Sequence, residues 1–335
     1  MPGKHLFFAL LLLPGVASAQ QITVHIGHFP NVTHAQAVVA EARHDLRSAF
    51  GPNVRVDWKL FNSGTEETQA LFAGAIDIAY IGPGPSVTGY VRSHGQAFRV
   101  IAGAVSGGAS LVVRGDSGIK KPEDFHGKRI ATPSLGNTQD IALRAWLQAH
   151  HLRTIQQGGD VTVVPVQNAD QLTLFLRKQI DAAWAPEPWA SRLVHRAHGR
   201  VFLDERSLWP QGRFVTTQVV VTTRFLREHP DLVKRFLTAH VAVTRWIQSH
   251  PDQARQVIAQ ELQRETHEAL LPQVLQDSLA HLEVTWDPIR SSLVQDAHEA
   301  QAAHFLPSVL PPLDGLYDLA PLHQVLARQN LPSVN

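Results

Sequence analysis

Four short segments of this chain are rich in Gly, Ser, Thr and Asn, a composition that suits anion binding. They are Phe29-Pro30-Asn31, Asn62-Ser63-Gly64, Gly82 to Ser86, and Ser134 to Thr138, and none contains Lys or Arg. Small side chains let the oxygens of a ligand approach the backbone, while hydroxyl and amide groups add hydrogen-bond donors. We therefore expect these segments to hold an anion through neutral donors.

Helix starts are predicted at or beside three of these segments. In each, a Thr, Ser or Asn is followed three positions later by an acid or an amide: Thr33 with Gln36, Ser63 with Glu66, and Asn137 with Asp140. This is the spacing of a capping box. Asn168 and Pro186 mark two further predicted starts. A helix start leaves unpaired N–H groups and the positive end of the helix dipole, so several that converge form an anion site without a cation.

The run Trp184-Ala185-Pro186-Glu187-Pro188-Trp189 follows a predicted strand and has two interpretations. Trp184 could cover the apolar part of a ligand, and Glu187 could bind an ammonium group. Equally, Trp184 could close a core while Glu187 complements a helix dipole.

Metal binding and catalysis have weaker signals. His25, His28 and His34 lie close in sequence among 19 His, but no H-E-x-x-H motif is present, so we interpret them as surface imidazoles and predict no metal site. The motifs G-x-S-x-G, G-x-G-x-x-G and G-x-x-x-x-G-K-[ST] are also missing. We expect no catalytic residue and no cofactor.

The elements that position these segments alternate between short apolar runs and helical patterns up to about Trp189, and from Thr223 the chain is nearly all helical. Helices are expected from Thr33, over 65–72 and from Ser86. The predicted strands are Ile22 to Gly27, Val54 to Trp58, Ile76 to Ile81, Phe98 to Val105, Ser110 to Arg114, Arg129 to Ala131, Val161 to Val166, Ile180 to Trp184, and Val215 to Thr222. This alternation predicts an α/β fold with parallel sheets and ligand sites at the carboxyl ends of the strands.

Length and composition add boundary conditions. The 335 residues suggest two domains, and 30 Lys+Arg against 29 Asp+Glu argue against a nucleic-acid partner. Lys4, the apolar run Leu6 to Leu13 and Ala17-Ser18-Ala19 predict a cleavable signal peptide over 1–19. With no Cys, the chain has neither disulfides nor a site for a lipid anchor. We expect an exported, periplasmic monomer.

Four segments resemble the substrate-binding proteins of bacterial ABC importers for sulfonates, taurine and nitrate, most closely the aliphatic-sulfonate branch. They are IGHFPNVTHAQA (26–37), LFAGAIDIAYIGPGPSVTGY (71–90), GKRIATPSLGNTQDIALRAWL (127–147) and DAAWAPEPWA (181–190). The resemblance implies a two-lobed type II periplasmic binding fold. Lobe 1 would be 20–106 and 210–335, lobe 2 would be 107–209, and strands crossing near Val105 and Phe214 would form the hinge.

The resemblance also implies a function and a site. The protein would bind a small organic sulfonate between the lobes and deliver it to an ABC permease with its cytoplasmic ATPase; nitrate, bicarbonate or a pyrimidine-type vitamin precursor are alternative ligands. The implied ligand-binding residues are Phe29, Asn31, Thr33, His34, Ser63, Gly64, Gly82, Pro83, Pro85, Ser86, Ser106, Asn137, Thr138, Trp184, Glu187 and Pro188.

Overall fold

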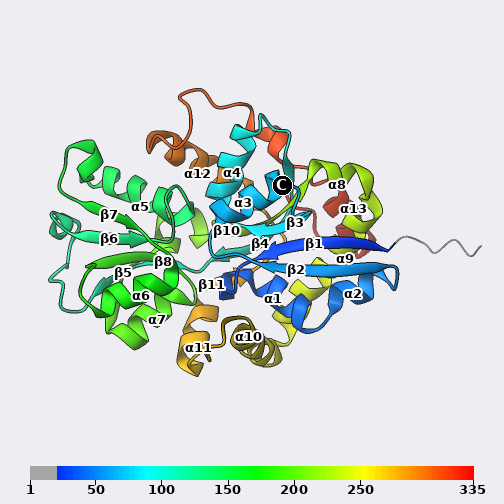
Figure 1. The fold of residues 1–335 in the computed structure, drawn as a ribbon, viewed down its shortest axis with the longest axis horizontal. Helices are drawn as coiled ribbons and strands as arrows, with labels where there is room; N and C mark the ends of the chain where they lie inside the picture. The colour runs from blue at the N-terminus through cyan, green and yellow to red at the C-terminus, as the bar shows by residue number, and fades with distance from the viewer. Residues whose placement is uncertain (1–20) are drawn as a thin grey trace, which may run out of the picture.

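The computed structural model describes residues 21–335 (Figure 1). The signal peptide expected over 1–19 lies outside this range. Within it, no helix is both long enough and apolar enough to cross a membrane.

Two β-sheets divide the structure into two lobes (Figure 1). The first-lobe sheet has the order β11-β4-β10-β3-β1-β2. Its strands are β1 (Ile22–His28), β2 (Val54–Leu60), β3 (Ile78–Ile81), β4 (Phe98–Gly107), β10 (Val215–Thr222) and β11 (Leu282–Val284). The second-lobe sheet has the order β7-β6-β8-β5-β9. Its strands are β5 (Ala109–Arg114), β6 (Arg129–Thr132), β7 (Thr162–Pro165), β8 (Ala182–Pro186) and β9 (Gly199–Asp204).

The expectation of parallel sheets holds for only part of each sheet. Strand β1 pairs in parallel with β2 and β3, and β6 does so with β7 and β8. In contrast, β10 runs antiparallel to β3 and β4, and β5 runs antiparallel to β8 and β9. The antiparallel strands β5 and β10 are the ones by which the chain enters the second lobe and returns to the first, so connectivity sets their direction.

The chain crosses between the lobes twice. The first crossing runs from β4 to β5 through Gly107 and Gly108, whose φ angles of 75° and 77° favour glycine. The second runs from β9 to β10, where Phe214 packs with Ala109 and Trp209 in a small cluster of buried residues. We propose that these two connections act as the hinge, with lobe boundaries near 106 and 210.

Helices cover both faces of each sheet. In the second lobe they are α5 (Thr138–Ala149), α6 (Asn168–Leu176) and α7 (Trp189–Ala197). The others are α1 (Ala35–Ala42), α2 (Asp45–Phe50), α3 (Gly64–Phe72), α4 (Pro83–Arg92), α8 (Thr223–Glu228), α9 (Pro230–Ser249), α10 (Pro251–Thr266), α11 (Pro272–Ala280), α12 (Arg290–Ala302) and α13 (Ala320–Arg328). Short 3₁₀ helices are η1 (Val32–His34), η2 (Pro122–Phe125), η3 (Ile155–Gln157), η4 (Glu205–Leu208), η5 (Pro210–Gly212) and η6 (Leu313–Leu316).

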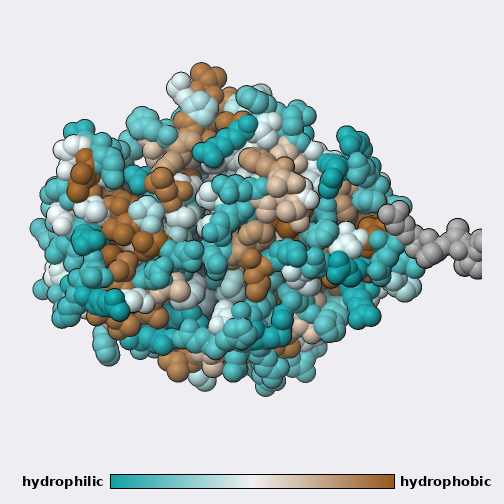
Figure 2. All heavy atoms as spheres, in the orientation of Figure 1, coloured by the Kyte–Doolittle hydropathy of each residue, from teal (hydrophilic) through white to brown (hydrophobic). Residues whose placement is uncertain are grey.

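Each sheet buries an apolar core on both of its faces. In the first lobe, α1, α9 and α10 pack on one face, and α4 and α12 pack on the other. In the second lobe, α5 covers one face, and α6 and α7 cover the other. The face of the molecule seen in Figure 2 is mostly hydrophilic with scattered hydrophobic residues, as expected when the apolar side chains are used in the cores.

Three predicted helix starts differ from the structure. Helix α4 begins at Pro83 rather than Ser86, and α7 begins at Trp189 rather than Pro186, which ends β8. Thr33 lies inside η1 and forms no cap. Its expected partner Gln36 is buried and donates instead to the Ala104 carbonyl of β4. Tertiary packing therefore overrides the local capping pattern there.

The first-lobe core contains a buried imidazole whose protonation the fold opposes. His240 of α9 accepts from the Tyr80 hydroxyl at Nδ1 (3.0 Å) and donates from Nε2 to the Gly103 carbonyl (2.8 Å). Burial lowers the pKa of His240 to about 4. Because the unfolded chain binds this proton at about pH 6.5, stability falls as pH decreases from about 6.5 to 4, by about 3 kcal/mol for this group alone.

We predict that His240→Gln removes this part of the acid sensitivity. The difference in unfolding free energy between pH 7 and pH 4.5, measured by urea denaturation, should be smaller in the variant by about 2 kcal/mol or more. His298→Gln, at an exposed position of α12, is the control and should behave as the unmodified protein does. Equal acid sensitivity in His240→Gln and the control would contradict the assignment.

Candidate ligand-binding site

A small cavity lies between the lobes, where three helices begin. It is lined by thirteen residues: Phe29, Asn31, Thr33, His34, Gly64, Gly82, Pro85, Asn137, Thr138, Gln139, Pro186, Thr216 and Thr217. None of these lining residues, all within the described range 21–335, is Lys, Arg, Asp or Glu. Gly64 and Gly82 belong to the starts of α3 and α4 in the first lobe, and Asn137 and Thr138 to the start of α5 in the second.

Two helix starts at this cavity are capped as the sequence predicts. The Ser63 hydroxyl accepts from the Glu66 N–H of α3 (3.3 Å), and the Asn137 amide oxygen accepts from the Asp140 N–H of α5 (3.0 Å). These caps use N–H groups of the third helical position only. The N–H groups of Gly64, Thr138 and Gln139 have no hydrogen-bond partner within 21–335. They point out of the helix starts, where the dipole is positive.

The lobes touch closely around the cavity. The Gly84 N–H of α4 donates to Thr138 Oγ1 (3.3 Å), and Trp189 Nε1 donates to Asn31 Oδ1 (3.0 Å). A Cβ added at Gly82 would lie 2.5 Å from Thr138 Oγ1. Glycine is therefore required at Gly82 for this approach. The remaining water-accessible space is about 30 Å³, room for about two water molecules.

His34 supplies a neutral donor. Its Nδ1 accepts from the Phe29 N–H (3.2 Å), so Nε2 carries the ring proton. Burial, and secondly the neighbouring His28, hold the pKa of His34 well below its ordinary value. The ring stacks on Phe29, with centroids 4.4 Å apart. The expectation that these imidazoles lie on the surface is wrong for His28 and His34, which are both buried.

Nine of the sixteen residues singled out from the sequence line this cavity: Phe29, Asn31, Thr33, His34, Gly64, Gly82, Pro85, Asn137 and Thr138. Four others of the sixteen do not line the cavity but belong to the elements that form it. Ser63 caps α3, Pro83 is the first residue of α4, and the Ser86 hydroxyl donates to the Gly82 carbonyl (2.8 Å). Ser106 Oγ accepts from the Phe214 N–H (3.2 Å) at the hinge.

Trp184, Glu187 and Pro188 lie outside the cavity lining. Trp184 is fully buried in the second-lobe core, and its Nε1 donates to Glu205 (2.7 Å). Burial raises the pKa of Glu205 to about 8. Pro188 precedes the first turn of α7. Trp184 therefore serves packing, which is one of the two interpretations that the sequence leaves open.

Glu187 is engaged by other residues. Its carboxylate accepts from the Ser191 N–H (3.1 Å) and hydroxyl (3.0 Å) of α7, and from the Ser278 hydroxyl (2.9 Å) of α11. His281 Nδ1 lies 3.4 Å away, and this contact raises the pKa of His281. The carboxylate thus ties α7 to α11 and is not free to bind an ammonium group in the cavity.

Four lining residues were missed from the sequence: Gln139, Pro186, Thr216 and Thr217. Gln139 directly follows Thr138, and Pro186 lies in the run that contains Trp184 and Glu187, so both were near singled-out positions. Thr216 and Thr217 are the second and third residues of β10, the strand by which the chain returns to the first lobe. The adjacent polar residues near the start of this strand were the available signal in the sequence.

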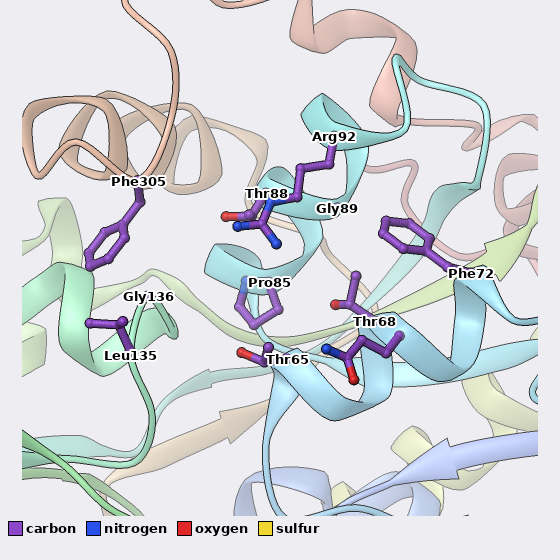
Figure 3. Close-up of a pocket in the computed structure, with 11 residues that line it drawn as sticks. Thr65, Thr68, Phe72, Pro85, Thr88, Gly89, Arg92, Leu135, Gly136 and Phe305 are labelled. Atoms are coloured by element: carbon purple, nitrogen blue, oxygen red, sulfur yellow. The ribbon is translucent and has the colours of Figure 1, made fainter.

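A second cavity of about 130 Å³ lies next to the first and shares Pro85 with it (Figure 3). Thr65, Thr68 and Phe72 of α3 line it, with Arg92 of α4 and Phe305 opposite. Although it is larger and also reaches Leu135 and Gly136 of the second lobe, most of its lining comes from the sides of α3 and α4, and the N–H groups of Gly64, Thr138 and Gln139 belong to residues of the smaller cavity. We therefore take the smaller cavity as the candidate anion site.

Comparisons with known proteins agree with this architecture. The taurine-binding periplasmic protein of Escherichia coli (strain K12) is 30% identical over 210 residues, which cover 62% of this chain and 63% of that protein. The structure of the alkanesulfonate-binding protein SsuA from Xanthomonas axonopodis pv. citri, bound to MOPS, superposes with a TM-score of 0.72 at 20% identity, over 89% of this chain and 99% of that one.

Two further solved structures show how widely this fold is used. The periplasmic nitrate-binding protein NrtA from Synechocystis PCC 6803 has a TM-score of 0.77 at 16% identity, over 95% of this chain and 93% of that one. The desulfurization enzyme DSZB has a TM-score of 0.66 at 19% identity, over 92% and 99%. At such identities the likeness shows the fold alone, which is the two-lobed α/β fold of periplasmic binding proteins.

The family is shown by the sequence. Residues 17–263 match the NMT1-like family, a range that covers more than half of the chain and includes every residue lining the candidate site. This chain belongs to the NMT1-like family.

Proposed function

We propose that this protein is the periplasmic solute-binding component of an ABC importer, and that it captures a small organic sulfonate and delivers it to the permease and its cytoplasmic ATPase. One observation carries the proposal: helix starts from both lobes meet at one cavity with free N–H groups and no cation in its lining. The relatives' printed names, and the signal peptide expected over 1–19, support export and transport. We propose a binding role without turnover.

The available donors suffice for useful affinity. The N–H groups of Gly64, Thr138 and Gln139, the Thr138 hydroxyl and the His34 ring offer five hydrogen bonds. Each bond to an ionised group contributes about 1.5–3 kcal/mol. After an association cost of about 4 kcal/mol, four such bonds of about 3 kcal/mol each, at the upper end of this range, leave about −8 kcal/mol, which is a micromolar dissociation constant.

The residues that line the cavity favour a ligand whose organic group is uncharged. Phe29, Pro85 and Pro186 are the apolar surfaces around the donors, and no carboxylate lines the cavity within the described chain. An alkyl group matches these surfaces, whereas the ammonium group of taurine would lie without a counter-charge. The engaged Glu187 also removes the contact on which a pyrimidine-type ligand would depend. We therefore place short alkanesulfonates before taurine.

The small volume favours a short ligand and supports one alternative. About 30 Å³ holds two water molecules, so a long alkyl chain needs the lobes to separate further than a short one does. A ligand stabilises the closed arrangement only by its preference for that state over the open one. Nitrate or bicarbonate, which has no alkyl group, is the second candidate.

We predict a ranked response in a ligand panel. Titration calorimetry with methanesulfonate, ethanesulfonate, hexanesulfonate, taurine and nitrate should give micromolar binding for the two short sulfonates. Taurine and hexanesulfonate should bind about 10-fold or more weakly. Nitrate binding tightest would move the assignment to the second candidate. If none of the five bound, the proposed anion site would be wrong.

We predict that Thr138→Val weakens sulfonate binding by about 10- to 100-fold. The variant loses one hydroxyl donor and the acceptor of the Gly84 N–H across the lobes, and one hydrogen bond to a charged group contributes about 1.5–3 kcal/mol. Thr173→Val, at an exposed position of α6, is the matched control and should bind normally. Unchanged affinity in Thr138→Val, measured by the same calorimetry, would place the ligand elsewhere.

A further inference from the structure

A cluster of three metal-ligating side chains lies behind the ligand cavity. His28 ends β1, Glu41 lies in α1 and Glu265 lies in α10, and one ligand atom from each lies within 4.8 Å of the other two. The side chains of His28 and Glu265 are fully buried, and that of Glu41 is 18% exposed. Three elements far apart in sequence thus bring one imidazole and two carboxylates together in the first lobe.

The orientation of the imidazole suits metal ligation. His28 Nδ1 lies 3.1 Å from the Phe29 carbonyl oxygen, to which it donates. In the neutral ring, Nε2 then carries the lone pair, and it faces the carboxylates of Glu41 (3.0 Å) and Glu265 (3.6 Å). A histidine that binds a metal through one nitrogen usually donates from the other to a carbonyl or carboxylate.

The buried carboxylate of Glu265 independently supports a bound cation at this cluster. Both of its carboxylate oxygens are buried and have no hydrogen-bond partner among the described residues. The 3.6 Å separation from His28 Nε2 is too long for a hydrogen bond. Burying a carboxylate without a partner is costly, so the position calls for a positive charge that these side chains do not fully supply.

The other charged groups around the cluster do not supply the positive charge that Glu265 lacks. Arg264 Nη2 binds Glu41 Oε1 (2.6 Å), which leaves Glu41 Oε2 facing His28, and Arg264 also pairs with Glu261. One guanidinium therefore serves two carboxylates on the outer side. Glu265, on the inner side, faces only the imidazole.

The spacing fits a transition-metal ion. Zinc bonds of about 2.0–2.2 Å to nitrogen and oxygen, at a tetrahedral angle, place the ligand atoms about 3.3 Å apart. The distances of 3.0 and 3.6 Å from His28 Nε2 lie on either side of this value. Mixed imidazole and carboxylate ligands suit zinc or a similar divalent ion.

We propose that His28, Glu41 and Glu265 bind one divalent transition-metal ion, with zinc as the probe. The ion has a bracing role. His28 donates to the Phe29 carbonyl, and the Phe29 N–H donates to His34 in the ligand cavity, so an ion on His28 holds the segment 28–34 that lines the site. This proposal stands independently of which anion the cavity binds.

The test is zinc binding to chelator-treated protein in the presence of a competing chelator, which suppresses weak sites on the many other His. The unmodified protein should retain one zinc per chain. Glu265→Gln should bind that zinc at least about 10-fold more weakly, because it loses a ligand. Glu67→Gln is the matched control, since Glu67 is also a buried carboxyl group whose two oxygens have no partner within 21–335.

A second measurement avoids variants that fail to fold. In ¹⁵N-labelled protein, zinc should shift the His28 Nε2 resonance, and half-saturation should match the zinc that the chelator competes for. Zinc retention in Glu265→Gln equal to that of the unmodified protein, or an unmoved His28 resonance at saturation, would overturn the proposal. The cluster would then be a buried ion pair only.

Discussion

The structure depends on helix starts from two lobes facing each other across a very small space. The first N–H groups of α3 and α5 have no partner within 21–335, and they lie at a cavity with room for about two water molecules. An unpaired buried N–H costs about 1–3 kcal/mol, so these groups need an acceptor when the lobes are this close. In the function proposed above, an anion is the acceptor, and its binding favours the arrangement in which the lobes are close.

Small residues make the close approach of the two lobes possible. Glycine at Gly82 and Gly84 lets α4 touch Thr138, because a Cβ at either would lie within 3.0 Å of the facing second-lobe atoms. Beside the cavity, Trp189 donates to Asn31, and farther from it the Glu187 carboxylate joins α7 to Ser278 of α11. Hydrogen bonds between the two lobes therefore lie around the free donors of the cavity.

Local signals in the sequence predicted nine of the eleven strands within 21–335, the caps at Ser63 and Asn137, and the segments that meet at the cavity, but they missed β9 and β11. What they missed depends on tertiary contacts. Thr33 and Gln36 have capping spacing, but Gln36 is drawn to the Ala104 carbonyl. The roles of Trp184 and Glu187 are set by Glu205 and Ser278, which lie 21 and 91 residues away. His28 is buried beside Glu41 of α1 and Glu265 of α10. The sequence around His28 gives no sign of these distant partners.

The central claim is that amides of both lobes bind one anion, and amide NMR tests it most directly. During titration with ethanesulfonate, the N–H resonances of Gly64, Thr138 and Gln139 should move downfield together and saturate at one dissociation constant. Shifts confined to Gly64, or to Thr138 and Gln139, would show that a single lobe holds the ligand. That result, or no shift in any of the three, would contradict the account.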